Sequence, residues 1–359
     1  MSFASYRRAA RHMAGCLLAI GLAGGAVADV QAAETVIHST GYTGVWFDAQ
    51  KACVFGPFNA QFKSEGLSVV ADPGLSSTTL VRLRTERSSP TLDVAWLDGG
   101  ISEQAWNDGV LGAIDPTVVT NMANMVPQGV YKSSNGDIYA LGAGFYAQGM
   151  FYNPKAVKDK PDSWWDLWKP EFAGRSIFPS PAQAPFVPTI VFLNKLLGGT
   201  ITNLDPVMKK FATLKVSQYY DATGVVQAAL ASGDILIGSY YVNVAWALAD
   251  TGLPVQPFTP KEGVPAGDIR VELVKGAPHK LDAEKFINFA VSDKALNCLA
   301  EKLYLGPPLK HPQLSEHARE RMPWGPNGSV ENLAIPNWNE INDHRAEVID
   351  QWNRKVINK

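Results

Sequence analysis

The chain has 359 residues, with 32 Lys and Arg, 34 Asp and Glu and a formal net charge of −2 at pH 7. A charge balance this close to zero gives no reason to expect nucleic acid or an anionic membrane surface as a partner. The length is enough for two domains of ordinary size.

Residues 1–32 have the three-part layout of a secretory signal peptide. Arginines form a positively charged segment, an uncharged apolar run covers residues 13–28, and small residues lead up to Ala33. The apolar run is shorter than the ~20 residues that a membrane span needs, so cleavage and export to the periplasm are favoured over a membrane anchor.

Two cysteines, Cys53 and Cys298, remain after this cleavage. In an oxidising compartment they can form a disulfide, and the alternative is a pair of buried free thiols. The sequence leaves both possibilities open.

Strands and helices alternate along the first part of the chain. Runs of β-branched and apolar residues predict strands at 35–39, 67–71 and 92–97, and apolar residues at a helical period predict helices at 46–63, 79–87 and 101–108. This alternation predicts a parallel or mixed α/β sheet.

A second α/β unit follows from residue 143 on. Strands are expected at 150–153, 176–178, 234–237 and 269–274, and helices at 163–168, 186–197, 205–214, 224–231, 242–250 and 281–292. A Pro-rich tail then leads to a last helix at 339–356.

Several stretches, in this order along the chain, resemble the family 1 extracellular solute-binding proteins of ABC importers, in particular the branch of spermidine- and putrescine-binding proteins. The stretches are SWWDLWKPEFAG at 163–174, GDILIG at 233–238, PKEG at 260–263, EKFINF at 284–289 and NDHRAEVIDQWN at 342–353. The resemblance implies the α/β, two-lobed, type II-like fold of periplasmic binding proteins, with the ligand cleft between lobes joined by two crossovers.

The resemblance also implies a division of the chain. Lobe one would comprise residues 34–142 and 268–312, lobe two residues 143–267, and the C-terminal tail, 313–359, would pack across both. Such a protein is expected to be a monomer without a cofactor, and to deliver a small-molecule ligand to the membrane permease subunits of an ABC transporter.

Loops after the first three predicted strands supply candidate ligand-binding residues. The family places an aromatic residue after the first strand, where this chain has Tyr42. The second loop offers hydroxyl groups just before a helix, and the third offers a carboxylate followed by a flexible backbone. These candidates are Ser76, Ser77, Thr78, Asp98 and Gly99. Capping of the following helices is the alternative role for the hydroxyls and the carboxylate.

The second lobe and the crossovers supply further candidates, again from the resemblance. Aromatic residues are expected to wall the cleft, and one serine follows the strand at 176–178. These candidates are Phe145, Tyr146, Ser180, Tyr240 and Tyr241. Packing in the hydrophobic core is the alternative role of each aromatic residue.

Departures from the polyamine-binding pattern bear on the charge of the ligand. Polyamine binders hold ammonium groups with carboxylates, but the loop at 179–184 contains no acid. Arg270 stands near the position of another of those acids, and a guanidinium binds carboxylate or phosphonate. An anionic or zwitterionic ligand is therefore predicted, with a polyamine as the alternative. Arg270 could instead pair with Asp268 or Glu272 at the surface.

Two other classes of function were weighed. Adjacent tyrosines serve as phenolate ligands in ferric-iron receptors, which makes Tyr240 and Tyr241 an alternative iron site. The sequence has no metal-binding histidine pair, nucleophile elbow, P-loop or dinucleotide-binding fingerprint. No enzymatic activity and no resident metal are therefore predicted.

Overall fold

A computed structural model describes residues 34–325, 327–333 and 335–358. The predicted signal peptide lies outside the described residues. Within the described part of the chain, no helix combines the length and the apolar character needed to cross a bilayer.

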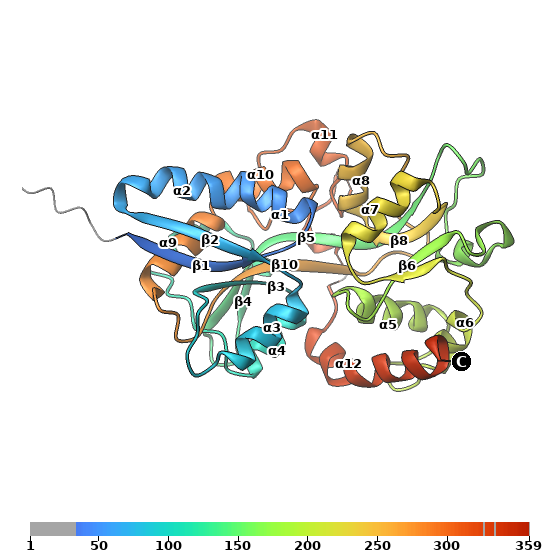
Figure 1. Cartoon of the computed structure of the whole chain (residues 1–359), viewed down its shortest axis with the longest axis horizontal. Helices are drawn as coiled ribbons and strands as arrows, with labels where there is room; N and C mark the ends of the chain where they lie inside the picture. Colours follow the sequence, from blue (N-terminus) through green and yellow to red (C-terminus); the bar gives the residue numbers. More distant parts are fainter. Residues whose placement is uncertain (1–33, 326, 334, 359) are drawn as a thin grey trace, which may run out of the picture. The chain divides into compact units, whose positions relative to one another are not determined.

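The described residues are built around one mixed sheet (Figure 1). Its strands are β1 (Thr35–Gly41), β2 (Leu67–Pro73), β3 (Val94–Asp98), β4 (Val130–Lys132), β5 (Ile138–Tyr152), β6 (Ser176–Pro179), β7 (Gln218–Tyr220), β8 (Ile237–Tyr241), β9 (Gln256–Phe258) and β10 (Ala266–Leu273). The main order is β2-β1-β3-β10-β5-β8-β6-β7, and β4 and β9 also pair with β5.

Two groups of parallel strands are joined by antiparallel strands in the middle of this sheet. β1 is parallel to β2 and β3, and β6 is parallel to β7 and β8. The long strand β5 pairs with β10 over its first part and with β8 over its last part. β5 and β10 therefore connect the group β1–β3, with its helices, to the group β6–β8.

Helices cover both faces of each group (Figure 1). They are α1 (Val45–Gln50), α2 (Gly56–Phe62), α3 (Ser76–Thr85), α4 (Ile101–Asn107), α5 (Phe186–Leu196), α6 (Asp205–Phe211), α7 (Thr223–Ser232), α8 (Val242–Asp250), α9 (Lys280–Ala290), α10 (Asp293–Leu303), α11 (Glu316–Arg319) and α12 (Trp338–Trp352). Short 3-10 or π turns are η1 (Lys51–Phe55), η2 (Lys63–Glu65), η3 (Thr120–Asn124), η4 (Pro127–Gly129), η5 (Trp164–Trp168), η6 (Pro170–Phe172), η7 (Val330–Asn332) and η8 (Asn353–Ile357).

The C-terminal helix α12 is anchored by its last residue. The indole of Trp352 is fully buried and packs against Phe186 and Phe211 of α5 and α6, with ring centroids 4.8 and 5.2 Å apart. Burial of a tryptophan among aromatic rings stabilises a helix far more than its own propensity does. α12 is thereby fixed beside the second strand group.

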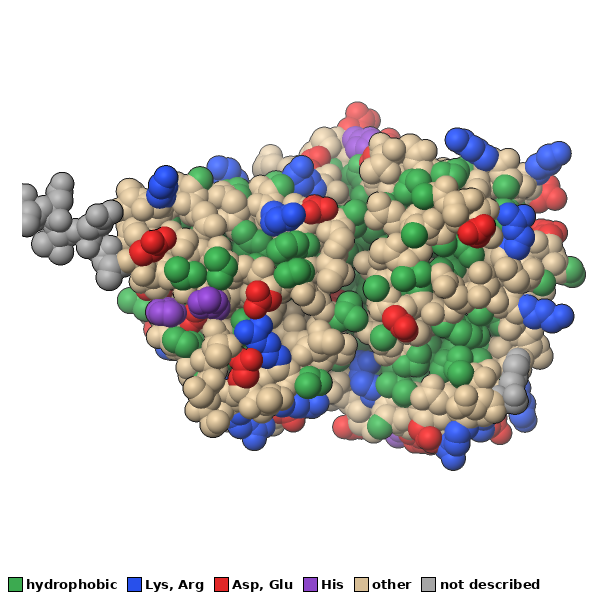
Figure 2. Space-filling model, in the orientation of Figure 1, with side chains coloured by type: hydrophobic (Ala, Val, Ile, Leu, Met, Phe, Trp, Pro, Cys, Tyr) green, Lys and Arg blue, Asp and Glu red, His purple; other side chains and the backbone are tan. Residues whose placement is uncertain are grey.

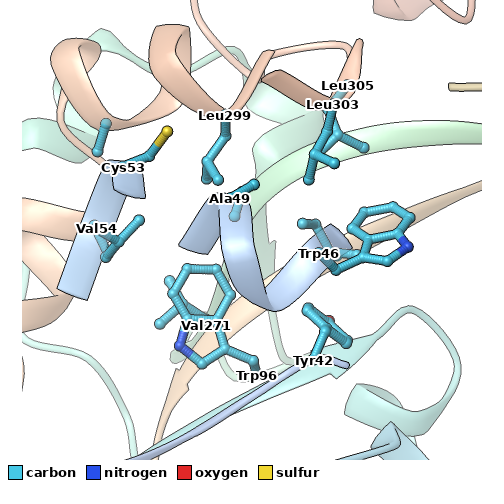
Figure 3. Close-up of a cluster of buried hydrophobic side chains, with 14 of the residues drawn as sticks. Tyr42, Trp46, Ala49, Cys53, Val54, Trp96, Val271, Leu299, Leu303 and Leu305 are labelled. Atoms are coloured by element: carbon cyan, nitrogen blue, oxygen red, sulfur yellow. The ribbon is translucent and has the colours of Figure 1, made fainter. Parts of the chain in front are cut away.

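The segment after β1 packs against α10 through small and apolar side chains. Figure 3 shows Ala49 and Cys53 facing Leu299 of α10. Cys53 forms a disulfide with Cys298, with the two sulfur atoms 2.06 Å apart. The structure thus contains the disulfide rather than two free thiols.

Some observed elements differ from the predicted ones, and others were not predicted. The strand predicted at 234–237 is observed as β8, which begins three residues later and ends four residues later, after the left-handed Gly233 ends α7. α10 was not predicted, because only two residues separate it from α9. The one sign of a new helix in this gap is Ser292, which caps the N-terminus of α10. The short strand predicted at 150–153 is the end of the much longer β5.

Candidate ligand-binding site

The carboxyl ends of strands from both groups meet at a cavity of about 280 Å³. In α/β sheets this is the edge at which ligands bind. The first group contributes Tyr42, Trp46, Ser76, Ser77, Asp98 and Ile101, and the second contributes Gln183, Thr223 and Tyr241. Ile269 of β10 and Arg345 and Ile349 of α12 complete the wall on the remaining side. The face in Figure 2 is hollowed between the two groups, and charges of both signs are scattered over it.

Aromatic side chains form one wall of the cavity. Trp46 lies 5.9 Å from Tyr42 and 5.5 Å from Tyr241, measured between ring centroids. Figure 3 shows Trp46 and Tyr42 side by side. The backbone N–H of Tyr42 donates to the side-chain oxygen of Gln50 at 2.8 Å, which fixes the loop after β1.

The hydroxyl of Tyr42 is buried and has no hydrogen-bond partner among the described residues. Burial, with the nearby Asp98 carboxylate, raises the pKa of Tyr42 well above its usual value, so the phenol stays protonated. A buried hydroxyl without a hydrogen-bond partner lowers the stability of a folded protein. Tyr42 thus brings a protonated, buried hydroxyl to the wall of the cavity, close to Ser76 and Asp98.

Asp98 places a buried carboxylate at the cavity. The Ser76 hydroxyl donates to one of its oxygens, and the Tyr146 hydroxyl donates to the other at 3.3 Å. Each carboxylate oxygen has a second lone pair, so Asp98 can still accept hydrogen bonds from a ligand. Burial raises the pKa of Asp98 to about 6. At neutral pH it is therefore largely ionised.

The two glycines that follow Asp98 allow the C-terminal helix α12 to pack closely against the backbone. A Cβ atom at Gly99 would lie 2.7 Å from the Trp338 indole, and one at Gly100 would lie 2.8 Å from the same ring. Gly100 also has a φ of 87°, which favours glycine. The close backbone approach expected at Gly99 is thus made by Trp338 of α12, and Gly99 does not line the cavity.

Several other predicted residues lie away from the cavity. The Thr78 hydroxyl donates to the Leu75 carbonyl at 2.8 Å and so serves the turn that starts α3. The Ser180 hydroxyl donates to the Asp221 carboxylate at 2.5 Å. Phe145 packs against Trp324, and Tyr146 lies behind Trp46 and Tyr241.

Arg270 does not occupy the position that the sequence suggested. Ile269 lines the cavity, and neighbouring residues of a strand point to opposite faces, so Arg270 points away from it. Its guanidinium is fully buried and donates to Asp268 and, at 2.7 Å, to Glu103. It also stacks on the Tyr131 ring at 3.5 Å. The pairing with Asp268 was foreseen, but it lies in the interior rather than at the surface.

Tyr240 and Tyr241 also point to opposite faces of their strand. Tyr241 lines the cavity, whereas the Tyr240 hydroxyl donates to the Thr223 carbonyl at 3.2 Å. Burial raises the pKa of both tyrosines, which disfavours the phenolate form that iron requires. Among the residues described, no group of three or more His, Cys, Asp and Glu side chains could hold a metal. The two hydroxyls therefore do not form a joint iron site.

The sequence analysis missed Trp46, Gln183 and Arg345. Trp46 lies at the start of a helix that apolar periodicity predicts, and its closeness in sequence to Tyr42 is the signal that the two residues can share a wall. Gln183 lies in the loop at 179–184, where the absence of acids was the only feature that bore on the ligand. Arg345 gave no signal, because only the packing of α12 brings it to the cavity.

A family model for bacterial extracellular solute-binding proteins matches residues 89–343. The chain belongs to this family. Its members are transport proteins that bind solutes, and the predicted resemblance to solute-binding proteins of ABC transporters is confirmed.

Individual relatives of this solute-binding protein have different ligands in their names. A Salmonella typhimurium periplasmic protein, whose name assigns it 2-aminoethylphosphonate, is 22% identical over 86% of this chain and 87% of its own length. The gamma-aminobutyric acid-binding protein of Pseudomonas aeruginosa is 25% identical over 82% of this chain and 83% of its own length. The Escherichia coli spermidine/putrescine-binding protein is 24% identical over smaller shares, 67% and 70%.

Solved structures of binding proteins share the fold. A periplasmic binding protein from Agrobacterium tumefaciens, in complex with agropinic acid, superposes with a TM-score of 0.72 at 20% identity. The match covers 90% of this chain and 99% of the other. The prediction of a type II-like periplasmic-binding-protein fold is confirmed.

Proposed function

We propose that this solute-binding protein captures a small zwitterion, with an amino group at one end and an acidic group at the other, for import. Lobe one (34–142 and 268–312) and lobe two (143–267) close on the solute, with the tail (313–359) packed across them. The chain acts as a monomer in the periplasm after loss of residues 1–32. It passes its ligand to the permease subunits and catalyses no reaction.

Asp98 is the observation that carries this proposal. Its ionised carboxylate faces a cavity walled by Tyr42, Trp46 and Tyr241. A carboxylate supplies the counter-charge that a buried ammonium group needs, and aromatic faces attract the same cation. An amino group is therefore the natural occupant of this end of the cavity.

The ligands named for two relatives fit this arrangement. Both 2-aminoethylphosphonate and 4-aminobutyrate carry an amino group and an acidic group on a short chain. Spermidine and putrescine carry only amino groups, and residues 181–184 on the opposite wall contain no carboxylate for a second one. A polyamine would leave that charge unpaired.

Replacing the carboxylate tests the proposal directly. We expect Asp98→Asn to weaken 4-aminobutyrate binding by roughly 30-fold or more in calorimetric titrations, because the ammonium loses its counter-charge. Affinity of the unaltered protein should fall by roughly tenfold between pH 7.5 and pH 5, since the pKa of free Asp98 is about 6 and the protonated form cannot pair with ammonium. The carboxylate of 4-aminobutyrate stays ionised over this range.

Thermal melting serves as the control for folding. A carboxylate whose pKa is raised by burial stabilises the fold below its unfolded pKa and loses that contribution as the pH rises through about 6. Asp98→Asn should therefore melt no lower than the unaltered protein at pH 7.5. Undiminished, pH-independent binding by the variant would refute the role of Asp98.

A further inference from the structure

We infer that Arg345, on the C-terminal helix α12, binds the acidic group of the solute, so that the tail of the chain is part of the recognition site. The inference rests on the proposed function and specifies the second end of the ligand. It concerns a residue outside both proposed lobes.

Neighbouring residues hold Arg345 in position. The Nε atom of Arg345 donates to the side-chain oxygen of Asn342 at 3.2 Å. Asn342 in turn donates to the Gly100 carbonyl at 2.6 Å, and its oxygen accepts from Gln104 at 3.1 Å. The guanidinium is therefore tied to the start of α4, directly after Asp98.

One of the two outer nitrogens of this guanidinium has no partner in the described part of the chain. The Nη2 atom of Arg345 is buried and makes no hydrogen bond to any described residue. It lies 3.1 Å from the place where a Cβ atom at Gly100 would be, so a side chain at this position would crowd it. A buried, charged donor without an acceptor costs free energy unless a ligand supplies the missing acceptor.

The other arginine at the cavity is already neutralised. Arg84 donates through Nε to the Asp108 carboxylate at 2.7 Å, and its Nη2 atom lies 2.6 Å from the same oxygen. Arg345 forms no such ion pair with any residue that the structure describes. Burial lowers the pKa of Arg345, and the charge of Asp98 partly offsets this effect. A guanidinium nevertheless remains protonated at neutral pH.

Asp98 and Arg345 thus present opposite charges to one cavity without forming an ion pair with each other. This arrangement suits a molecule whose own charges are separated in the opposite sense. A carboxylate or phosphonate would accept hydrogen bonds from the guanidinium while the amino group pairs with Asp98. The chemical class is a short amino acid with its amino and acidic groups at opposite ends.

Titration of variants with 4-aminobutyrate and 2-aminoethylphosphonate tests the assignment. We expect Arg345→Gln to weaken binding of both by roughly 30-fold or more, and Arg345→Lys to recover part of the loss. The control is Arg354→Gln in η8, because Arg354 is exposed and donates to Asp350 outside the cavity. Its affinities should change by less than about threefold. Melting curves of all variants establish that they fold.

The possible outcomes separate this inference from the proposed function. If the unaltered protein binds either zwitterion and Arg345→Gln binds it equally well, the inference fails while the proposed function stands. If Arg354→Gln weakens binding as much as Arg345→Gln, the effect is a general one of charge and the inference also fails. If the unaltered protein binds neither zwitterion, the proposed ligand class fails and the inference falls with it.

Discussion

Arg270 shows that a shift of one position along a strand changes the role of a charged side chain, because neighbouring residues point to opposite faces. The resemblance to polyamine-binding proteins suggested that Arg270 lies at the ligand. In the structure it faces the interior and neutralises Asp268 and Glu103. Its contribution should therefore be to stability.

Arg270→Ala leaves two buried or nearly buried carboxylates without their partner. We expect the free energy of unfolding to fall by roughly 3–5 kcal/mol, as measured by chemical denaturation. Arg82→Ala is the matched control, since its pairs with Asp72 and Glu86 are partly exposed to solvent and should contribute less than about 1 kcal/mol. Loss of ligand affinity without loss of stability would instead return Arg270 to the ligand site.

For single residues, the sequence predicted only part of the candidate site. Tyr42, Ser76, Ser77, Asp98 and Tyr241 line the cavity because positions after parallel strands converge. Arg270 and Tyr240 do not, because alternation along a strand decides which neighbour faces the cavity, and the exact register was not readable. Arg345 depends on how a distant helix docks, which local patterns do not encode.

Among the elements, the disulfide joins parts that are 245 residues apart in the sequence. It ties η1, next to the aromatic wall, to α10. We expect the double variant Cys53→Ser, Cys298→Ser to lose roughly 2–5 kcal/mol of unfolding free energy, because the unfolded chain gains freedom. Ligand affinity should be unchanged, since neither cysteine lines the cavity.

Reducing agent gives an independent check of the same bond. Dithiothreitol should destabilise the unaltered protein by a similar amount and leave the double serine variant unaffected. Equal denaturation curves for the two proteins without reductant would contradict a stabilising disulfide.

Apolar periodicity predicted most of the helices and strands, but it predicted the residues at which they begin and end less accurately. The helix expected at 46–63 is observed as α1, η1 and α2 in succession. The length of β5 was missed because it is buried along nearly its whole length and shows no alternation of polar and apolar residues. The cavity wall depends on these ends, since Tyr241 is the last residue of β8.

For the whole molecule, the order of motifs along the chain predicted the family and the fold, and both are confirmed. The sequence predicted the charge of the ligand from Arg270. In the structure, Asp98 and Arg345 are the residues whose charges suit a zwitterionic ligand. The expected ligand class is similar, but the residues that support it differ. By the inference for Arg345, helix α12, which packs beside the second strand group, would also take part in ligand recognition.

Recognition of a zwitterion is tested most directly by calorimetric titration with three compounds of the same carbon skeleton: 4-aminobutyrate, putrescine and butyrate. In the proposed site only the first compound can pair with both Asp98 and Arg345, so we expect it to bind at least about tenfold more tightly than either of the others. Putrescine or butyrate binding as tightly as 4-aminobutyrate would contradict recognition of a zwitterion in this cavity.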